Sequence, residues 1–270
     1  MELAWHGGPS VSLRLEGQVV VVDPSLSGPG DYGDWFMPNR NAPDPDTYLR
    51  EFRPDAVLIT HGHFDHFDLE TVRLLARTCR PLFGGSSDVV ATIGRHFAEL
   101  EPRALPLEPG RTEPLSRSLT VGALEGIHWL TGEEGRRVAA RFEGRPDRWG
   151  VMPCGGPMLS FVVRGGEHQI YFSGDTELEG IPSLTVTVAV INVGGPVRDP
   201  VTKQPVQCIA SPGDVARALS ERLAARVVVP IHYDHPVFLE RVDPGDIEAL
   251  LPEGPPVLRL PFNRWVKVEL

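Results

Sequence analysis

Cysteine and lysine are both scarce in this sequence of 270 residues. The three cysteines, Cys79, Cys154 and Cys208, are widely spaced and odd in number, and none belongs to a CxxC pair. This pattern argues against a disulfide framework and against a cysteine-based zinc knuckle, and it favours a reducing compartment. Lysine occurs only at Lys203 and Lys267, so arginine provides almost all of the positive charge.

Long apolar runs and a basic leader are also missing. No segment approaches the roughly 18 apolar residues that a transmembrane helix needs. The first ten residues, MELAWHGGPS, lack the basic region and apolar run of a signal peptide. The formal net charge of −10 argues against a broad surface for nucleic acid or anionic membranes. We therefore expect a cytoplasmic protein that acts on a small-molecule substrate and binds no nucleic acid.

What is present is the composition of an ordinary globular protein, with 41% hydrophobic and 23% charged residues. The first half is expected to contain a hairpin around Glu16-Gly17, a strand at 56–60, a helix starting near Asp68 and a further helix over 88–100. The second half is expected to contain strands at 119–127, 158–164, 168–173, 186–193 and 226–231, with helices at 212–225 and 246–251. This order predicts one domain over residues 1–270, made of two similar β/α halves packed sheet against sheet with the helices outside.

Two polar segments interrupt this pattern. The loop 25–47 is rich in Gly, Pro, Asp and Asn and carries Trp35 and Phe36, and the insert 131–156 is Gly-rich and polar. Irregular segments of this length are commonly functional. We expect both segments to shape a pocket, with Trp35 and Phe36 covering it. The alternative is that these aromatic rings anchor the loop on the outside of the fold.

The segment Thr60-His61-Gly62-His63-Phe64-Asp65-His66 concentrates metal-binding chemistry. Three histidines and one aspartate fall within six residues, directly after an apolar strand. Imidazole and carboxylate groups are the ligands that suit zinc and related divalent metals. A tight turn after the strand can direct His61 and His63 to one side and Asp65 and His66 to the other. The segment therefore predicts two adjacent halves of a metal site.

Three later residues occupy comparable positions. His128 follows the apolar run 119–127, Asp175 lies in YFSGDTEL, and His232 lies in VVVPIHYDH. Each has a structural alternative when taken singly, because an aspartate can end a turn and a histidine can be buried in a core. Their shared placement at strand ends favours a common site.

The motif HGHFDH is similar to the HxHxDH signature of the metallo-β-lactamase superfamily, which also requires a lone histidine, an aspartate and a final histidine in that order. The resemblance extends over most of the chain and implies an α+β fold, the four-layer αββα sandwich. It also implies two divalent metal ions, zinc in the first place, with manganese or iron as alternatives. By this resemblance one metal is bound by His61, His63 and His128, the other by Asp65, His66 and His232, and Asp175 bridges them.

The beginning of the chain resembles one branch of that superfamily. AWHGGPSVSLRLEG followed by VVVVDPSLSG is similar to the branch of L-ascorbate-6-phosphate lactonase and N-acyl-phosphatidylethanolamine phospholipase D. Those relatives usually carry Gly-His-(Ala/Ser) near the first strand, whereas this sequence reads His6-Gly7-Gly8-Pro9, with a glycine in place of one histidine. His6 is therefore expected either to line the site or to pack at the edge of the sheet.

The resemblance implies hydrolysis of a lactone, ester or phosphoester by a hydroxide that bridges two metals. Asp175 would orient the hydroxide, and Tyr233 and His235, next to His232, would act as oxyanion donor or acid unless their role is structural. The alternatives are an iron-dependent oxidoreductase, a nuclease, or a non-catalytic metal-binding member of the same fold. Flavodiiron-type relatives replace the second motif histidine by glutamate and add a flavin domain, and neither feature is present.

Overall fold

The computed structural model describes the chain except for residues 29–38, 129–154 and 199–202. The elements of the first half are β1 Glu2–Trp5, β2 Val11–Leu15, β3 Gln18–Val22, α1 Pro45–Glu51, β4 Ala56–Leu58, α2 Leu69–Thr78, β5 Leu82–Gly85, α3 Ser87–His96, η1 Ala98–Leu100 and β6 Arg103–Pro106. Those of the second half are β7 Thr112–Pro114, β8 Thr120–Glu125, β9 Leu159–Gly165, β10 His168–Phe172, η2 Leu178–Gly180, β11 Leu184–Asn192, β12 Val197–Arg198, β13 Pro205–Val206, α5 Pro212–Glu221, β14 Leu223–Ile231, α6 Gly245–Leu250 and β15 Val266–Lys267. Among these described residues, no helix is long and apolar enough to cross a membrane.

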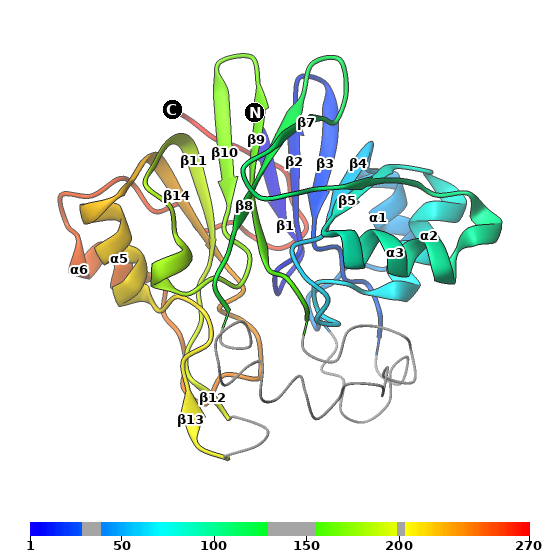
Figure 1. Ribbon diagram of the computed structural model, residues 1–270. Helices are drawn as coiled ribbons and strands as arrows, with labels where there is room; N and C mark the ends of the chain where they lie inside the picture. Colours follow the sequence, from blue (N-terminus) through cyan, green and yellow to red (C-terminus); the bar gives the residue numbers. More distant parts are fainter. Residues whose placement is uncertain (29–38, 129–154, 199–202) are drawn as a thin grey trace.

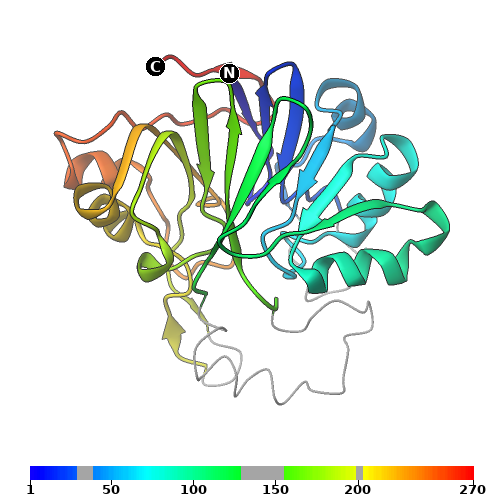
Figure 2. The same ribbon diagram turned by 45° about the horizontal axis from the view of Figure 1, so that its top comes forward.

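Two sheets form the centre of the molecule. One sheet has seven strands in the order β15-β1-β2-β3-β4-β5-β6, and the other has six in the order β14-β11-β10-β9-β8-β7. Helices α1, α2 and α3 cover the outer face of the first sheet, and α5 and α6 cover that of the second (Figures 1 and 2). The last strand, β15, returns to pair with β1, so the two ends of the chain lie side by side. The arrangement is the predicted αββα sandwich of four layers.

Three apolar layers hold the sandwich together. The central layer packs side chains of both sheets against each other, including Leu13 of β2, Phe161 of β9 and Val229 of β14, all fully buried. A second layer lies between the first sheet and α1–α3, and a third lies between the second sheet and α5–α6. Each sheet is apolar on both faces because it is covered on both, which explains the continuous runs such as VVVV in β3.

The local patterns predicted most of these elements, with two errors in the extent of helices. The helix predicted over 88–100 ends at His96 and is followed by the short 3-10 helix η1. The hairpin β2–β3 turns at Glu16 and Gly17, both of which have positive φ angles, as a two-residue turn requires. The helix predicted over 212–225 ends at Glu221, because residues 223–225 pair with β11 as the start of β14. Alanine-rich sequence favours a helix locally, and strand pairing overrides that preference here.

The start of α5 provides a stability prediction. The Ser211 hydroxyl accepts a hydrogen bond from the Asp214 amide, and the Asp214 carboxylate accepts one from the Ser211 amide. Replacing Ser211 by alanine should lower the free energy of unfolding by about 1 kcal/mol, because it removes this capping box. Urea denaturation of the Ser211→Ala and Ser211→Thr variants checks this. Equal loss in both variants would contradict it, because threonine retains the hydroxyl.

Candidate metal centre

The residues singled out in the sequence all follow strands, and the structure brings them to one edge of the sandwich. His61 to His66 follow β4, His128 follows β8, Asp175 follows β10 and His232 follows β14. Their metal-binding atoms form three overlapping groups, each with all its atoms within 4.8 Å of one another. The groups are His61, His63 and His128; His61, His66 and Asp175; and Asp65, His66 and His232. Together they include all seven proposed ligands, which are called the seven-residue cluster below.

One half of the cluster consists of three imidazoles. His61 Nε2 lies 2.8 Å from His63 Nδ1, and the rings of His61 and His128 are 5.3 Å apart between centroids. His128 Nδ1 lies 2.6 Å from the carbonyl oxygen of Cys208, which makes Nδ1 the donor and Nε2 the acceptor nitrogen. Burial and then the neighbouring His128 lower the pKa of His63 to about 3. These rings are therefore neutral and present lone pairs to the same space.

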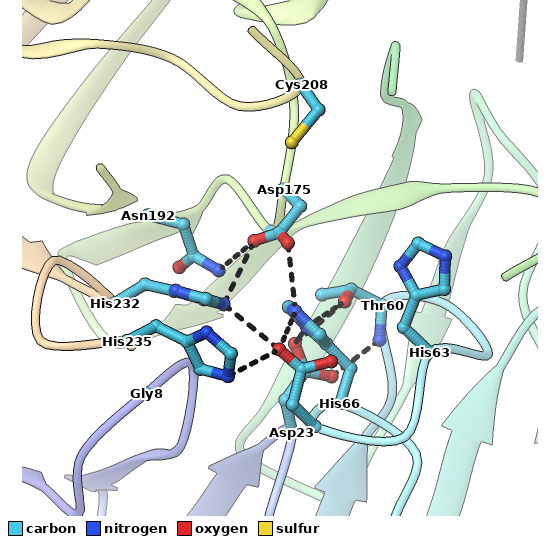
Figure 3. Close-up of polar contacts among 12 residues, drawn as sticks. Gly8, Asp23, Thr60, His63, His66, Asp175, Asn192, Cys208, His232 and His235 are labelled. Carbon is cyan, nitrogen blue, oxygen red and sulfur yellow. Dashed lines mark hydrogen bonds and ion pairs between the residues drawn. The ribbon is translucent and has the colours of Figure 1, made fainter. Parts of the chain in front are cut away.

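The other half of the cluster contains the carboxylates (Figure 3). His66 Nε2 lies 3.1 Å from Asp175 Oδ2 and 3.7 Å from Asp65 Oδ2. His232 Nε2 lies 3.3 Å from Asp65 Oδ2 and 3.7 Å from Asp175 Oδ1. Burial opposes ionisation of Asp175, but His66 and His232 outweigh it and hold the pKa of this carboxyl well below its usual range. Asp175 therefore lies ionised between the two halves.

Two buried residues that the sequence analysis missed orient this half. Asp23 Oδ2 lies 2.7 Å from His66 Nδ1, and its two oxygens also accept hydrogen bonds from the amide and hydroxyl of Thr60. Asn192 Nδ2 donates to Asp175 Oδ1 over 2.8 Å. A sequence signal exists for both, because each is a polar residue at the end of an apolar strand, in VVVVD and VAVIN.

The end of the insert 131–156 reaches the cluster. The Gly62 amide donates a hydrogen bond of 2.7 Å to the Gly155 carbonyl. Gly155 has a φ angle of +74°, and a Cβ atom there would lie 2.9 Å from the His61 ring and 3.0 Å from that of His63. Glycine therefore allows the backbone to pass directly against the two imidazoles. The rest of the insert up to residue 154 lies mostly outside the described residues, as do Trp35 and Phe36, so their role over the pocket stays a prediction.

The two residues after His232 differ in their placement. His235 Nε2 lies 3.7 Å from Asp65 Oδ2, and its Nδ1 accepts a hydrogen bond from the Val237 amide, so Nε2 carries the proton in the neutral ring. Tyr233 instead packs its ring against Trp5, 4.8 Å away between centroids, and joins the central apolar layer. Its proposed role as oxyanion donor stays a prediction that no contact among the described residues supports.

His6 packs in the core. Its ring nitrogens lie 2.8 Å from Ser12 Oγ and 3.0 Å from Asn263 Oδ1, and its ring contacts Tyr48 and Phe52 edge-on. Burial lowers the pKa of His6 to about 4, so the ring is neutral. Of the two expectations for His6, packing at the sheet is the one that the structure supports.

The donor set fits divalent metal ions. A histidine that binds a metal through one nitrogen usually donates the other N–H to a carboxylate or a backbone carbonyl. His66 and His128 both have this arrangement, with Nδ1 held by Asp23 or by the Cys208 carbonyl and Nε2 directed into the cluster. Neutral imidazoles, as in the three-histidine half, and ionised carboxylates are also the forms that bind zinc, manganese and iron. Burial opposes the charge on His66, but Asp175 and Asp65 outweigh it and raise the pKa of this ring, so His66 would release a proton when a metal binds.

Comparisons with known proteins identify the family and the fold of the chain. Residues 18–233 match the family described as a beta-lactamase superfamily domain. A UPF0173 metal-dependent hydrolase from Methanopyrus kandleri is 27% identical over 238 residues, which cover 86% of this chain and 84% of that protein. Two solved structures share the fold. The metallo hydrolase Igni18 from Ignicoccus hospitalis matches with a TM-score of 0.70 at 17% identity, and the match covers 100% of this chain and 98% of that one. An isothiocyanate hydrolase from Delia radicum gut bacteria matches with a TM-score of 0.71 at 18% identity, and the match covers 100% of both chains.

Proposed function

The chain belongs to the beta-lactamase superfamily domain family and is a metal-dependent hydrolase of the metallo-β-lactamase fold, and on this basis we propose that it cleaves a lactone, ester or phosphoester bond at a centre of two divalent ions. His61, His63 and His128 would hold one ion, Asp65, His66 and His232 the other, and Asp175 both. The proposal includes one domain over residues 1–270, because strands of both halves contribute to the central apolar layer.

The orientation of the histidine rings is the observation that carries the proposal. Asp23 and the Cys208 carbonyl fix the Nδ1 atoms of His66 and His128, so both Nε2 atoms face the cluster before any ligand arrives. Holding a catalytic site in this prepared geometry avoids reorganisation during the reaction. A fold kept only as a scaffold has no need of such buried polar groups, which are costly without a function or full pairing.

Each residue of the centre has a definite task. When bound, two divalent ions lower the pKa of a bound water to near neutrality and polarise the bond to be cleaved. Asp175, whose Oδ1 accepts a hydrogen bond from Asn192, would orient the attacking water. His235 presents an Nε2–H donor beside Asp65, where it can protonate the leaving group or stabilise the developing negative charge.

A panel of substrates tests this proposal. Lactones, carboxylic esters, phosphodiesters and phosphonates are assayed with zinc and with manganese, and an isothiocyanate is added because one structural neighbour is named for that substrate. We expect hydrolysis of at least one oxygen ester class and about two metal ions per chain by elemental analysis. A protein that carries far less metal and hydrolyses nothing in the panel would contradict the proposal and support the non-catalytic alternative.

A further inference from the structure

A small hollow of 150 Å³ lies beside the metal centre. It is lined by Gly8, Asn39, Arg40, Asn41, Asp234 and His235, which come from three distant parts of the chain. His235 also lies 3.7 Å from Asp65, so the hollow and the metal centre share this histidine. We propose that the hollow is a subsite for an anionic group of the substrate, a carboxylate or a phosphate, bound by Arg40. This inference rests on the proposed hydrolase function and narrows its substrate class.

The turn that carries Arg40 is held on both sides. Asn39 Nδ2 donates to the backbone carbonyls of His6 and Gly7, over 2.8 and 3.1 Å, and Asn41 Nδ2 donates to Asp234 Oδ2 over 2.7 Å. Gly7 has a φ angle of +86°, and a Cβ atom there would lie 2.7 Å from Asn41 Cβ. Only glycine therefore lets the turn approach so closely. Arg40 lies between two anchored asparagines and is presented at the hollow by a fixed backbone.

The charge of Arg40 is not used elsewhere in the described part of the chain. No ion pair or hydrogen bond joins its guanidinium to another described side chain, so within the described part of the chain its N–H groups are open to a ligand. Asp234 lines the same hollow, but its two oxygens accept hydrogen bonds from the Gly8 amide and from Asn41. A guanidinium with open donors matches the planar oxygens of a carboxylate or a phosphate.

A larger hollow that His235 also lines has a different charge distribution. It has a volume of 520 Å³ and contains Arg259, whose guanidinium is paired with Glu248 at 3.3 Å. Its wall also includes Arg241 and three carboxylates, so acidic side chains outnumber the arginines there, whereas the smaller hollow has one of each. Between the two hollows that border the histidine, the smaller one is therefore the better site for an anion.

Room for the ligand is available next to the metal centre. A Cβ atom placed on Gly8 would have no atom within 4 Å, so this wall of the hollow is open. His235 Nε2–H faces the space between the hollow and Asp65. A substrate with its anionic group on Arg40 would therefore pass His235 and bring its reactive bond toward the seven-residue cluster.

Anion binding without turnover tests the subsite. Inorganic phosphate and acetate are titrated into the purified, metal-containing protein by calorimetry, for the wild type, Arg40→Gln and Arg226→Gln. Arg226 is an exposed arginine on β14 without an ion pair among the described residues, and it is a matched control. We expect Arg40→Gln to raise the Kd of the better-bound anion about tenfold, which is about 1.4 kcal/mol, and Arg226→Gln to leave it unchanged. A larger effect on phosphate assigns a phosphoryl group to the subsite, and a larger effect on acetate assigns a carboxylate.

The outcomes separate the subsite from the hydrolase proposal. Absence of anion binding to the wild type, or equal Kd values for the wild type and Arg40→Gln, would overturn the subsite even if the protein hydrolyses esters. A tenfold change in Kd supports the subsite even if no ester in the panel is cleaved. Where an ester is cleaved, Arg40→Gln should raise KM for a substrate with an anionic arm and leave KM for its neutral analogue unchanged.

Discussion

Replacing Asp175 by alanine is expected to lower kcat/KM by at least about a thousandfold, because in the proposed centre this residue would hold both metal ions and orient the attacking water. One of its oxygens lies within 4.8 Å of the metal-binding nitrogens of His61, in the three-histidine half, and of His66, in the other half, so it is the carboxylate that faces both sides of the cluster. Elemental analysis should show loss of both metals from Asp175→Ala. Kinetics on the substrate identified in the panel gives the loss of activity.

Asp65→Ala is the matched control for that experiment. Asp65 lies near His66, His232 and His235, which are all on one side of the cluster. This variant should lose the metal of that side and keep the ion held by the three-histidine half. Loss of one metal from each of the two variants would show that Asp175 is an ordinary terminal ligand, and the bridging role would have to be abandoned.

The second large effect is expected at Asp23, which acts through His66. Removing its carboxylate leaves His66 Nδ1 without the acceptor that fixes the ring, in a site closed to solvent. Loss of such a supporting group typically weakens metal binding by about 10- to 100-fold. We therefore expect Asp23→Ala to lower metal affinity by that amount, as measured by competition with a zinc chelator well below the unfolding temperature. Asp23→Asn should recover part of the loss, since its amide oxygen still accepts from Nδ1–H.

Asp68 provides a control of equal burial. Its carboxylate is as closed to solvent as that of Asp23, and it accepts hydrogen bonds from the Leu26 amide and the Ser27 hydroxyl instead of a cluster histidine. Asp68→Ala should therefore reduce stability but not metal affinity. If Asp68→Ala and Asp23→Ala weaken metal binding equally, Asp23 supports the fold in general and does not position His66 in particular.

The predicted elements and the observed fold agree because the sheets are covered on both faces. Strand β4 is then apolar throughout and β11 is apolar from Val188 to Ile191, and a continuous apolar run is a clear local signal. The error at the end of α5 has the opposite origin. Residues 223–225 are Leu-Ala-Ala, which favours a helix locally, and they form a strand because they pair with β11. Pairing between strands distant in the sequence cannot be seen in a local pattern.

The candidate ligands were visible for a different reason. His61, His63, Asp65 and His66 are neighbours in the sequence, so their chemical type and spacing already indicate a metal site. His128, Asp175 and His232 are single residues whose meaning came from their place after apolar strands and from the resemblance. Asp23 occupies the same kind of position after β3, but an aspartate followed by proline is also typical of a turn.

By itself, the sequence determined the layers of the fold and the chemical identity of the proposed ligands, because hydrophobic runs and ligand types are local properties of the chain. Only the tertiary structure decided which groups orient those ligands and what lies beside them. Asp23 meets His66 across 43 residues, and Asn41 meets Asp234 across 193. Such contacts depend on the register of the strands and on the packing of one sheet against the other, and these are set by the whole core at once.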